Sequence, residues 1–234
     1  MTILVQLDDA IAAMKRLPDE TIDMVYADPP YAISKVSGWK NTWNGYQQDK
    51  GDWDRVDGDY GDFTRLWLAE AIRLLRPGGI ICISGVFGSL VPAFVFLEEQ
   101  GLRFQSHLVW WKTNPAPSVH RRIFTHANEL VVIFSKGANW TFNYDVLKER
   151  NGGKQQHNVV RLASCRKIAG IIRKPDALMD LLVLAFTNEG DTILDPFMGT
   201  GSMPLAANRA KRKAIGIDNN EIAFQAAKKR FGWE

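Results

Sequence analysis

Hydrophobic positions along the chain follow two different spacings, which together predict strands and helices in regular alternation. Short unbroken apolar runs bounded by turn residues are typical of strands that are buried on both faces of a sheet. Apolar residues spaced three and four positions apart predict helices that bury one face. The runs predict strands over residues 2–7, 22–27, 80–84, 104–111, 130–134, 192–194 and 213–217. The helical spacing predicts helices over residues 10–17, 63–74, 92–100, 176–186, 203–210 and 221–230.

Strands that alternate with helices favour an α/β fold, in which a mostly parallel sheet is covered on both faces. Two segments interrupt the alternation. Residues 34–62 are rich in Gly, Asn, Asp and Gln yet carry five aromatic residues, and a loop of that length is usually functional or mobile. We expect a mobile loop that closes over a ligand, or else a lid packed on its own core. Between residues 136 and 173 the periodicity fades and basic residues accumulate, which predicts an inserted recognition segment.

The composition is that of a folded globular protein, because 46% of the 234 residues are hydrophobic and 24% are charged. It excludes a largely disordered chain and a fibrous repeat. No apolar run approaches the roughly 18 residues that a membrane helix needs, and the first residues lack the pattern of a secretion signal. Cys82 and Cys165 are too few for a disulfide framework or a four-ligand zinc site. We therefore expect a chain that works in the cytoplasm, with no membrane partner and no metal.

Charge is distributed unevenly along the chain. Residues 112–174 carry 12 Lys and Arg against 3 Asp and Glu, a net charge of +9. The remaining residues carry 17 against 23, a net charge of −6. A basic block inside an otherwise acidic chain is typical of a protein that binds a polyanion. A solvated basic surface is the alternative.

A glycine turn follows the strand predicted over residues 192–194. Residues 195–201, with the sequence DPFMGTG, lead into a helix at the carboxyl end of that strand, where ligands bind in such sheets. The next strand ends in Asp218, whose carboxylate can accept both hydroxyl hydrogens of a ribose. Pro204 replaces the third glycine of a dinucleotide site, and no Gly-Lys-Ser/Thr is present. A nucleoside without phosphates therefore fits better, and a plain strand-to-helix turn is the alternative.

A second candidate site follows the strand predicted over residues 22–27, in the tetrapeptide Asp28-Pro29-Pro30-Tyr31. Its groups suit the exocyclic amine of a flat nucleobase. Asp28 offers carboxylate oxygens to the amine N–H groups, and the carbonyl of Pro29 keeps free lone pairs. Tyr31 offers an aromatic face on which a base can stack, worth about 1–3 kcal/mol. A rigid Pro-Pro turn with a capping Asp is the alternative.

Taken in chain order, the tetrapeptide, the basic segment and the glycine turn resemble the amino-group DNA methyltransferases that use S-adenosylmethionine, in the arrangement called the beta class. The resemblance covers nearly the whole chain and includes residues 17–31, 75–79, 110–112 and 126–129. It implies a Rossmann-like methyltransferase fold whose mostly parallel central sheet has one antiparallel strand, with a circularly permuted motif order. It also implies a single methyltransferase domain over residues 1–234.

The resemblance implies where S-adenosylmethionine is held. The glycine turn would line its methionine end, Asp218 would hold the ribose, and Asp9 lies in the segment that contacts the adenine. Lys174 belongs to a Lys-Pro pair that resembles the end of a family segment, although residues 170–173 depart from that segment. The expected cofactor-binding residues are Asp9, Ala10, Asp28, Lys174, Asp195, Pro196, Phe197, Gly199, Thr200, Gly201, Ser202 and Asp218.

The family further implies that Asp28, Pro29, Pro30 and Tyr31 form the catalytic pocket for an amine flipped out of double-stranded DNA. Asp in the first position favours adenine N6, whereas Ser is commoner among cytosine-N4 enzymes, which stay an alternative. A catalytically silent DNA-binding partner subunit and an RNA methyltransferase are further alternatives. We expect a bacterial or phage restriction-modification setting, and a homodimer is consistent with the short recognition segment. The expected DNA-binding residues are Trp39, Lys40, Lys112, Arg121, Arg122, Lys154, Arg161, Arg166 and Lys167.

Two other reactions on nucleobases find no support in the sequence. Carbon-5 methylation of cytosine needs a reactive thiolate, but Cys82 lies in an apolar run and is expected to be an inert core residue. We expect Cys165, in a basic context, to be a spectator thiol. The four histidines form no pattern typical of a zinc deaminase.

Overall fold

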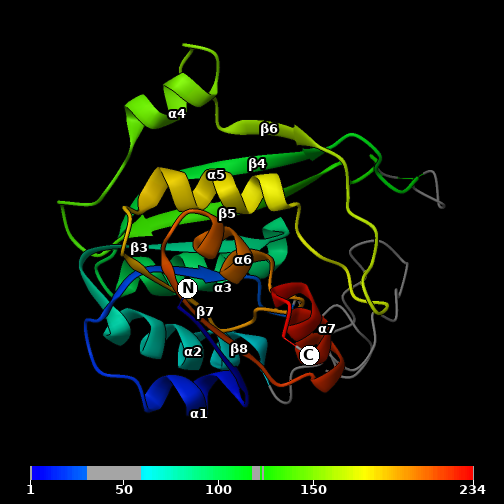
Figure 1. Cartoon of the computed structure of the whole chain (residues 1–234). Helices are drawn as coiled ribbons and strands as arrows, with labels where there is room; N and C mark the ends of the chain where they lie inside the picture. The colour runs from blue at the N-terminus through cyan, green and yellow to red at the C-terminus, as the bar shows by residue number, and fades with distance from the viewer. Residues whose placement is uncertain (1, 31–58, 118–121, 123, 234) are drawn as a thin grey trace.

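The apolar runs form the strands of one eight-stranded sheet in the computed structural model, which describes residues 2–30, 59–117, 122 and 124–233. The strands are β1 (Ile3–Leu7), β2 (Ile22–Ala27), β3 (Leu75–Gly85), β4 (Arg103–Lys112), β5 (Asn128–Ser135), β6 (Val159–Leu162), β7 (Thr192–Asp195) and β8 (Lys213–Asp218). Across the sheet they follow the order β1-β8-β7-β2-β3-β5-β4-β6 (Figure 1).

One strand of this sheet, β5, runs antiparallel to both of its neighbours, β3 and β4. Every other neighbouring pair is parallel. The expected mostly parallel sheet with one antiparallel strand is therefore confirmed. Because β5 is reversed, its first residues lie at the same edge of the sheet as the carboxyl ends of the other strands.

Helices cover both faces of the sheet, as the alternating pattern predicts. They are α1 (Ala10–Lys15), α2 (Tyr60–Leu74), α3 (Phe87–Glu99), α4 (Tyr144–Arg150), α5 (Asp176–Phe186), α6 (Ser202–Arg209) and α7 (Glu221–Phe231). The buried side chains of α1, α2 and α3 form one core with the sheet, and those of α5 and α6 form a second core on the other face (Figure 1). The two cores fix the strand ends that carry the candidate site.

Two elements begin five residues earlier than the sequence predicts. Helix α3 starts at Phe87 rather than at residue 92 and keeps Pro92 inside it, which removes one amide donor from the helix. Leu90, Ala93 and neighbouring apolar side chains of α3 are buried, and this burial offsets the loss. Strand β3 starts at Leu75 rather than at residue 80, because the arginine, proline and glycines of residues 76–79 form an irregularity within the strand instead of a separate turn.

The basic segment 136–173 contains two elements that its weak periodicity did not predict. Helix α4 buries Leu147 in the core beneath α5. Strand β6 pairs in parallel with β4 and extends the sheet by one edge strand. A seven-residue helix and a four-residue edge strand each carry too few buried positions to produce a clear hydrophobic pattern.

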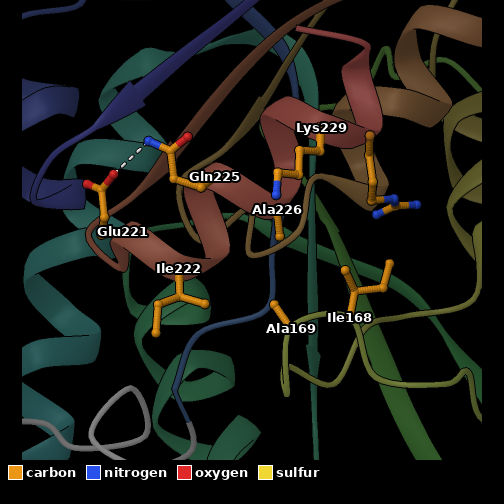
Figure 2. A pocket seen from close by; sticks show the side chains of 8 residues that line it. Ile168, Ala169, Glu221, Ile222, Gln225, Ala226 and Lys229 are labelled. Carbon is orange, nitrogen blue, oxygen red and sulfur yellow. Dashed lines mark hydrogen bonds between the residues drawn. The ribbon is translucent and has the colours of Figure 1, made fainter. Parts of the chain in front are cut away.

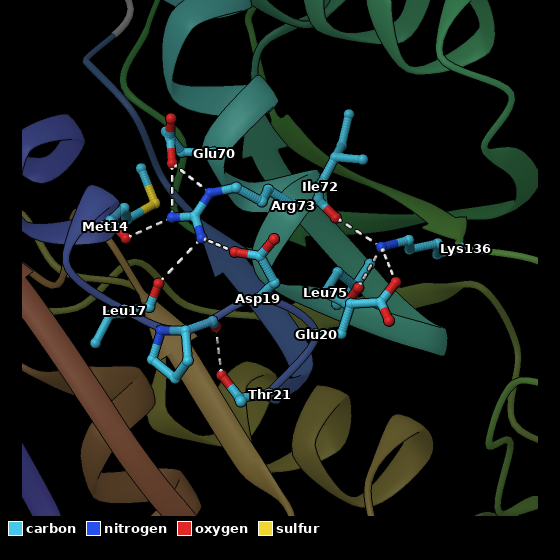
Figure 3. Close-up of polar contacts among 11 residues, drawn as sticks. Met14, Leu17, Asp19, Glu20, Thr21, Glu70, Ile72, Arg73, Leu75 and Lys136 are labelled. Atoms are coloured by element: carbon cyan, nitrogen blue, oxygen red, sulfur yellow. Dashed lines mark hydrogen bonds and ion pairs between the residues drawn. The ribbon is translucent and has the colours of Figure 1, made fainter.

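The end of α1 is held by a guanidinium group from α2 (Figure 3). Arg73 donates hydrogen bonds to the backbone carbonyls of Met14, at 2.8 Å, and Leu17, at 3.0 Å. Nη1, which reaches Leu17, also contacts the carboxylate of Asp19, and Nε donates to the carboxylate of Glu70 at 2.8 Å. The last carbonyls of a helix have no partner within the helix, so a cation placed there satisfies them and also interacts favourably with the helix dipole.

Lys136 performs the same task at the end of α2 (Figure 3). Its ammonium donates to the carbonyls of Leu75, at 2.7 Å, and Ile72, at 3.1 Å, and pairs with Glu20 at 3.1 Å. Both contacts lie away from the edge that carries Asp28, which follows β2 at its other end. These stabilising contacts at the ends of α1 and α2 therefore lie at the edge of the sheet opposite to the candidate site.

We predict that Arg73→Met lowers the free energy of unfolding by about 2 kcal/mol, because hydrogen bonds to charged groups contribute roughly 1.5–3 kcal/mol each and water replaces part of the loss. Arg65→Met is the matched control, since Arg65 is exposed, pairs with exposed Glu99 and otherwise lies over the ring of Phe96. That control should lose no more than about 1 kcal/mol. Urea denaturation measures both values, and equal losses in the two variants would contradict the capping role.

Candidate active site at the carboxyl edge of the sheet

Three aspartates lie side by side where neighbouring parallel strands end. Asp218 ends β8, Asp195 ends β7, and Asp28 directly follows β2, which is the next strand in the sheet. Neighbouring strands are about 4.8 Å apart, so the three carboxylates form one acidic row. The two candidate sites that the sequence predicted separately therefore belong to a single site.

Backbone amides orient two of these carboxylates. Asp218 accepts hydrogen bonds from the amide of Gly199 at 2.7 Å and the amide of Asn220 at 2.9 Å, one on each oxygen. Asp195 accepts one from the amide of Phe197 at 3.2 Å. A carboxylate has about four lone-pair positions, so Asp218 keeps acceptor capacity for further hydroxyl donors.

The glycine turn is held in a backbone conformation that other residues rarely adopt. Gly199 has φ +53° and Gly201 has φ +78°. A Cβ on Gly201 would lie 2.5 Å from the ring of Phe231, whereas a Cβ on Gly199 would meet nothing within 4 Å. Gly201 therefore packs closely against α7, and Gly199 faces open space where a ligand can approach the backbone.

An arginine from α7 braces this turn. Arg230 donates from Nη1 to the carbonyl oxygen of Thr200 at 2.7 Å and to Oγ of Ser202 at 3.2 Å, and from Nη2 to Asp176 at 3.0 Å. These contacts join the turn to the starts of α5 and α6. The sequence did not single out Arg230, because its last-helix position carries no motif.

Burial and mutual repulsion make the acidic row electrostatically costly. Burial raises the pKa of Asp195 well above its usual value, and the charges of Asp28 and Asp218 raise it further. Burial also raises the pKa of Asp218. Asp28 and Asp218 are thus both close enough to Asp195 to influence it, as expected of a site that binds a polar ligand.

One lysine neutralises part of this negative charge. Lys174 Nζ lies 2.6 Å from Oδ1 and 2.5 Å from Oδ2 of Asp28, and 3.2 Å from Oε2 of Glu129. Burial by itself would lower the pKa of Lys174, but the carboxylates of Asp28 and Glu129 outweigh it and raise the pKa. Lys174 therefore stays a cation between two carboxylates.

Glu129 is an acidic residue of the site to which the sequence gave no role. Its Oε1 lies 2.6 Å from Nζ of Lys112. Burial opposes ionisation, but Lys174 and Lys112 together lower the pKa of Glu129 to about 2. A signal was present in the sequence, because a lone acid directly precedes the apolar run 130–134. Only the reversed direction of β5 places that acid beside Asp28.

The two prolines of the tetrapeptide follow Asp28 after the end of β2. Pro29 is buried and Pro30 is half-buried, while Tyr31 lies outside the described residues. Beneath them Tyr26 is buried, with its hydroxyl 2.9 Å from Oγ of Ser84. Burial raises the pKa of Tyr26 well above its usual value, so this hydroxyl stays protonated.

The predicted adenine-binding segment lies next to Asp218. The amide of Asp8 donates to the carbonyl of Asp218 at 3.1 Å, which places Asp9 and Ala10 at the edge of the acidic row. Asp9 is exposed and caps α1, accepting a hydrogen bond from the amide of Ala12 at 2.8 Å.

The predicted DNA-binding residues are distributed unevenly. Arg161 stacks on half-exposed Trp111 at 4.5 Å, at the carboxyl ends of β4 and β6. Lys112 is mostly buried and pairs with Glu129, with its ammonium 5.0 Å from the ring of Trp110. The other described residues of this set are exposed: Arg122, Lys154, Arg166 and Lys167. Trp39, Lys40 and Arg121 lie outside the described residues, as does most of the predicted loop 34–62, whose last residues begin α2.

The cysteines and the possible metal ligands bear on the two other reactions, carbon-5 methylation of cytosine and zinc-dependent deamination. Cys82 is buried in the sheet, and burial raises its pKa, so its thiol is not a nucleophile at neutral pH. Within the described ranges no group of three or more His, Cys, Asp or Glu residues could hold a metal ion. In the same part of the chain no helix combines the length and apolar character needed to cross a membrane.

A hollow of about 630 Å³ lies beside α7, next to this site (Figure 2). It does not contain the acidic row, but Arg230 connects it to the glycine turn. Most of its surface is apolar and comes from one side of α7, along most of that helix, and from the turn at residues 168–171. Its lining residues are Ile168, Ala169, Glu221, Ile222, Gln225, Ala226, Lys229 and Arg230.

Comparison with known proteins finds DNA methyltransferases that match most of the chain. A family model described as DNA methylase matches residues 22–229. The Type II methyltransferase M2.DpnII of Streptococcus pneumoniae is 35% identical over 232 residues, which cover 95% of this chain and 87% of that protein. The crystal structure of an M1.HpyAVI–SAM complex has a TM-score of 0.73 at 24% identity, covering 98% of this chain and 99% of that one. The cytosine-N4-specific PvuII DNA methyltransferase has a TM-score of 0.76 at 20% identity, covering 99% and 86%.

We predict that Asp195→Asn stabilises the ligand-free protein at pH 7.5 by roughly 1 kcal/mol or more, since one pKa unit corresponds to about 1.36 kcal/mol. The folded state raises the pKa of Asp195, so the ionised carboxylate destabilises the fold as the pH rises above 3.8. The amide removes that charge and keeps an acceptor for the amide of Phe197. Thermal unfolding between pH 4 and pH 8 should show a gain that grows with pH. A variant that is less stable than wild type at pH 7.5 would contradict this account.

Proposed function

The chain belongs to the DNA methylase family of S-adenosylmethionine-dependent amino-group methyltransferases, and from this we propose that it methylates the exocyclic N6 of adenine in double-stranded DNA. The observation that carries the proposal is the single acidic row, because it places the Asp-Pro-Pro segment beside the glycine turn. An amine-binding pocket and a cofactor site must share one edge for the methyl group to pass directly between them.

The residues of the row fit the cofactor. Asp218 is held by two backbone amides and keeps acceptor positions for ribose hydroxyls, and the open side of Gly199 lets the cofactor approach the backbone. Asp195 is buried beside Asp28 and Asp218, which raises its pKa, and a cationic ligand would favour its ionised form. When bound, S-adenosylmethionine supplies a methyl group that its sulfonium already activates. The protein therefore contributes positioning and electrostatics rather than a covalent nucleophile.

Asp28 and Pro29 are the groups that we propose to hold the target amine. The Asp28 carboxylate and the Pro29 carbonyl accept its two N–H hydrogens, which turns the nitrogen lone pair out of the ring plane and toward the donor. After transfer the nitrogen is positively charged and loses a proton to Asp28 or to water. Tyr31 provides the face on which the flipped base stacks.

Adenine is favoured over cytosine because Asp28 opens the tetrapeptide. The PvuII enzyme is named as cytosine-N4-specific, and at 20% identity its likeness supports the fold alone. Expression in a host without DNA methylation, followed by mapping of the modified bases, decides between the two. N4-methylcytosine in that DNA would replace the adenine proposal, and labelled RNA added in competition tests the RNA alternative.

We also propose how the chain meets its DNA and its surroundings. The exposed arginines and lysines of segment 136–173 contact phosphates, and loop 34–62 closes over the flipped base. The chain acts as one domain in the cytoplasm of a bacterium, the setting of the Streptococcus relative. Self-association as a homodimer would let two short recognition segments share one site, and light scattering with and without DNA tests it.

We predict that Asp28→Ala abolishes methyl transfer, lowering the single-turnover rate by at least about 100-fold, while the protein still binds S-adenosylmethionine. The alanine removes an acceptor of the amine, but Asp218 and the glycine turn are unchanged. Asp180→Ala is the matched control, because Asp180 is equally ion-paired and its side chain is 26% exposed against 28% for Asp28. Isothermal titration and labelled-cofactor transfer measure the two properties. A variant with full activity would refute the pocket, and an inactive wild type would favour the silent-subunit alternative.

We predict that Arg161→Ala weakens DNA binding and makes it less dependent on salt. Each phosphate contact contributes about 0.9 to the slope of log affinity against log salt, so the slope should decrease by about 1. Arg209→Ala should leave the slope unchanged, because Arg209 lies on α6 and pairs with Asp180. Fluorescence anisotropy between 50 and 200 mM salt, concentrations at which phosphate contacts change affinity strongly, measures both. Identical slopes for wild type and Arg161→Ala would remove Arg161 from the interface.

A further inference from the structure

Glu129 joins two lysines that come from different parts of the site. It is the second residue of β5, whose antiparallel direction brings it to the edge where Asp28 follows β2. Its Oε1 lies 2.6 Å from Nζ of Lys112, and its Oε2 lies 3.2 Å from Nζ of Lys174. Lys174 in turn contacts both oxygens of Asp28. Asp28, Lys174, Glu129 and Lys112 therefore form a row of alternating charges.

The two oxygens of Glu129 are used unequally. Oε1 accepts a hydrogen bond from Lys112, whereas Oε2 is fully buried and has no hydrogen bond within the described part of the chain. Its separation from Lys174 is that of an ion pair without hydrogen-bond geometry. Oε2 is thus a charged acceptor next to an ammonium that is at present directed to Asp28.

Capture of an amine affects the contact between Asp28 and Lys174. Both oxygens of Asp28 lie within 2.6 Å of the Lys174 ammonium, so an incoming N–H group must share the carboxylate with that ammonium. If Lys174 simply withdrew from Asp28, a buried ammonium would lose its contacts with both oxygens of that carboxylate, and the loss of charged contacts is costly in a protein interior. A second carboxylate within reach of the same ammonium removes that cost.

Building on the proposed function, we infer that Glu129 is a positioning residue: it accepts the Lys174 ammonium when the Asp28 carboxylate turns to the target amine. The required movement is small, because Oε2 is already 3.2 Å from Nζ and a charged hydrogen bond forms at about 2.8 Å. Lys112 holds the opposite oxygen and keeps Oε2 directed at Lys174. The ion pair is exchanged rather than broken.

The role depends on charge, and two variants of Glu129 separate charge from shape. Glu129→Gln keeps the shape but loses the charge, and its amide nitrogen would face one of the two ammonium groups. Glu129→Asp keeps the charge and loses one methylene. We expect the single-turnover methylation rate to fall at least tenfold in Glu129→Gln and by a smaller factor in Glu129→Asp. The Kd for S-adenosylmethionine, measured by calorimetry, should stay within about threefold of wild type in both.

Glu70→Gln is the matched control. Glu70 is ion-paired with Arg73 on α2, and its side chain is 18% exposed against 14% for Glu129, but it does not touch the site. It should methylate at the wild-type rate. Thermal unfolding of all three variants shows whether each is folded at the assay temperature, so that rates are compared only between folded proteins.

Two results would overturn the inference. If Glu129→Gln methylates as fast as Glu70→Gln, the charge of Glu129 has no role in the reaction. If Glu129→Asp methylates more slowly than Glu129→Gln, the shape of the side chain rather than its charge determines the rate. Failure of the proposed function looks different, because it would leave the wild type inactive or Asp28→Ala fully active. The Glu129 role fails alone when wild type and Asp28→Ala behave as proposed and the Glu129 variants do not.

Discussion

The ion pair between Lys174 and Asp28 is the interaction on which the candidate site depends. Asp28 stands at the end of the acidic row. Burial opposes the ionisation of Asp195 and Asp218, and at Asp195 repulsion by the other two carboxylates adds to it. A single buried ammonium, held by Asp28 and Glu129, compensates part of this charge. The fold must therefore place Lys174 at the end of β2 and the start of β5. It does so through the start of α5, whose apolar side chains anchor that helix to the sheet.

The reversed direction of β5 has a chemical consequence beyond topology. In a fully parallel sheet the first residue of a strand lies at the edge opposite to the ligand site. Because β5 is antiparallel to β3 and β4, Glu129 starts at the edge where its neighbours end. The fold thereby adds an acid from an amino end to a site otherwise built from carboxyl ends. This acid connects Lys112, at the rim beside Arg161 and Trp111, with Lys174 beside Asp28.

Much of the fold was predictable from the sequence because buried strands and amphipathic helices leave strong local patterns. The mostly parallel sheet with one antiparallel strand is confirmed, and β2 and α5 have the predicted bounds. Helix α4 and strand β6 were missed, since short elements with few buried positions leave weak patterns.

The site was predictable only in part. Motifs located Asp28, Asp195 and Asp218, and the structure places them side by side, while their roles stay predictions. Pairwise contacts such as Lys174 with Glu129 join residues 45 positions apart in the sequence, and no local pattern encodes them. Lys112 is an example. The sequence predicted a DNA contact because this residue is basic, whereas in the structure its ammonium forms an internal ion pair with Glu129.

Contacts that stabilise the fold and the residues of the candidate site lie at opposite edges of the sheet. At one edge Arg73 and Lys136 donate hydrogen bonds to backbone carbonyls where α1 and α2 end, and this favours the folded state. At the other edge the acidic row destabilises the folded state, as residues held ready for a ligand commonly do. Strand β2 spans the distance between them, about 20 Å for its six residues. Charged contacts that far apart are largely screened from each other in physiological salt, so substitutions in the site can change its chemistry without disturbing the contacts that stabilise the fold.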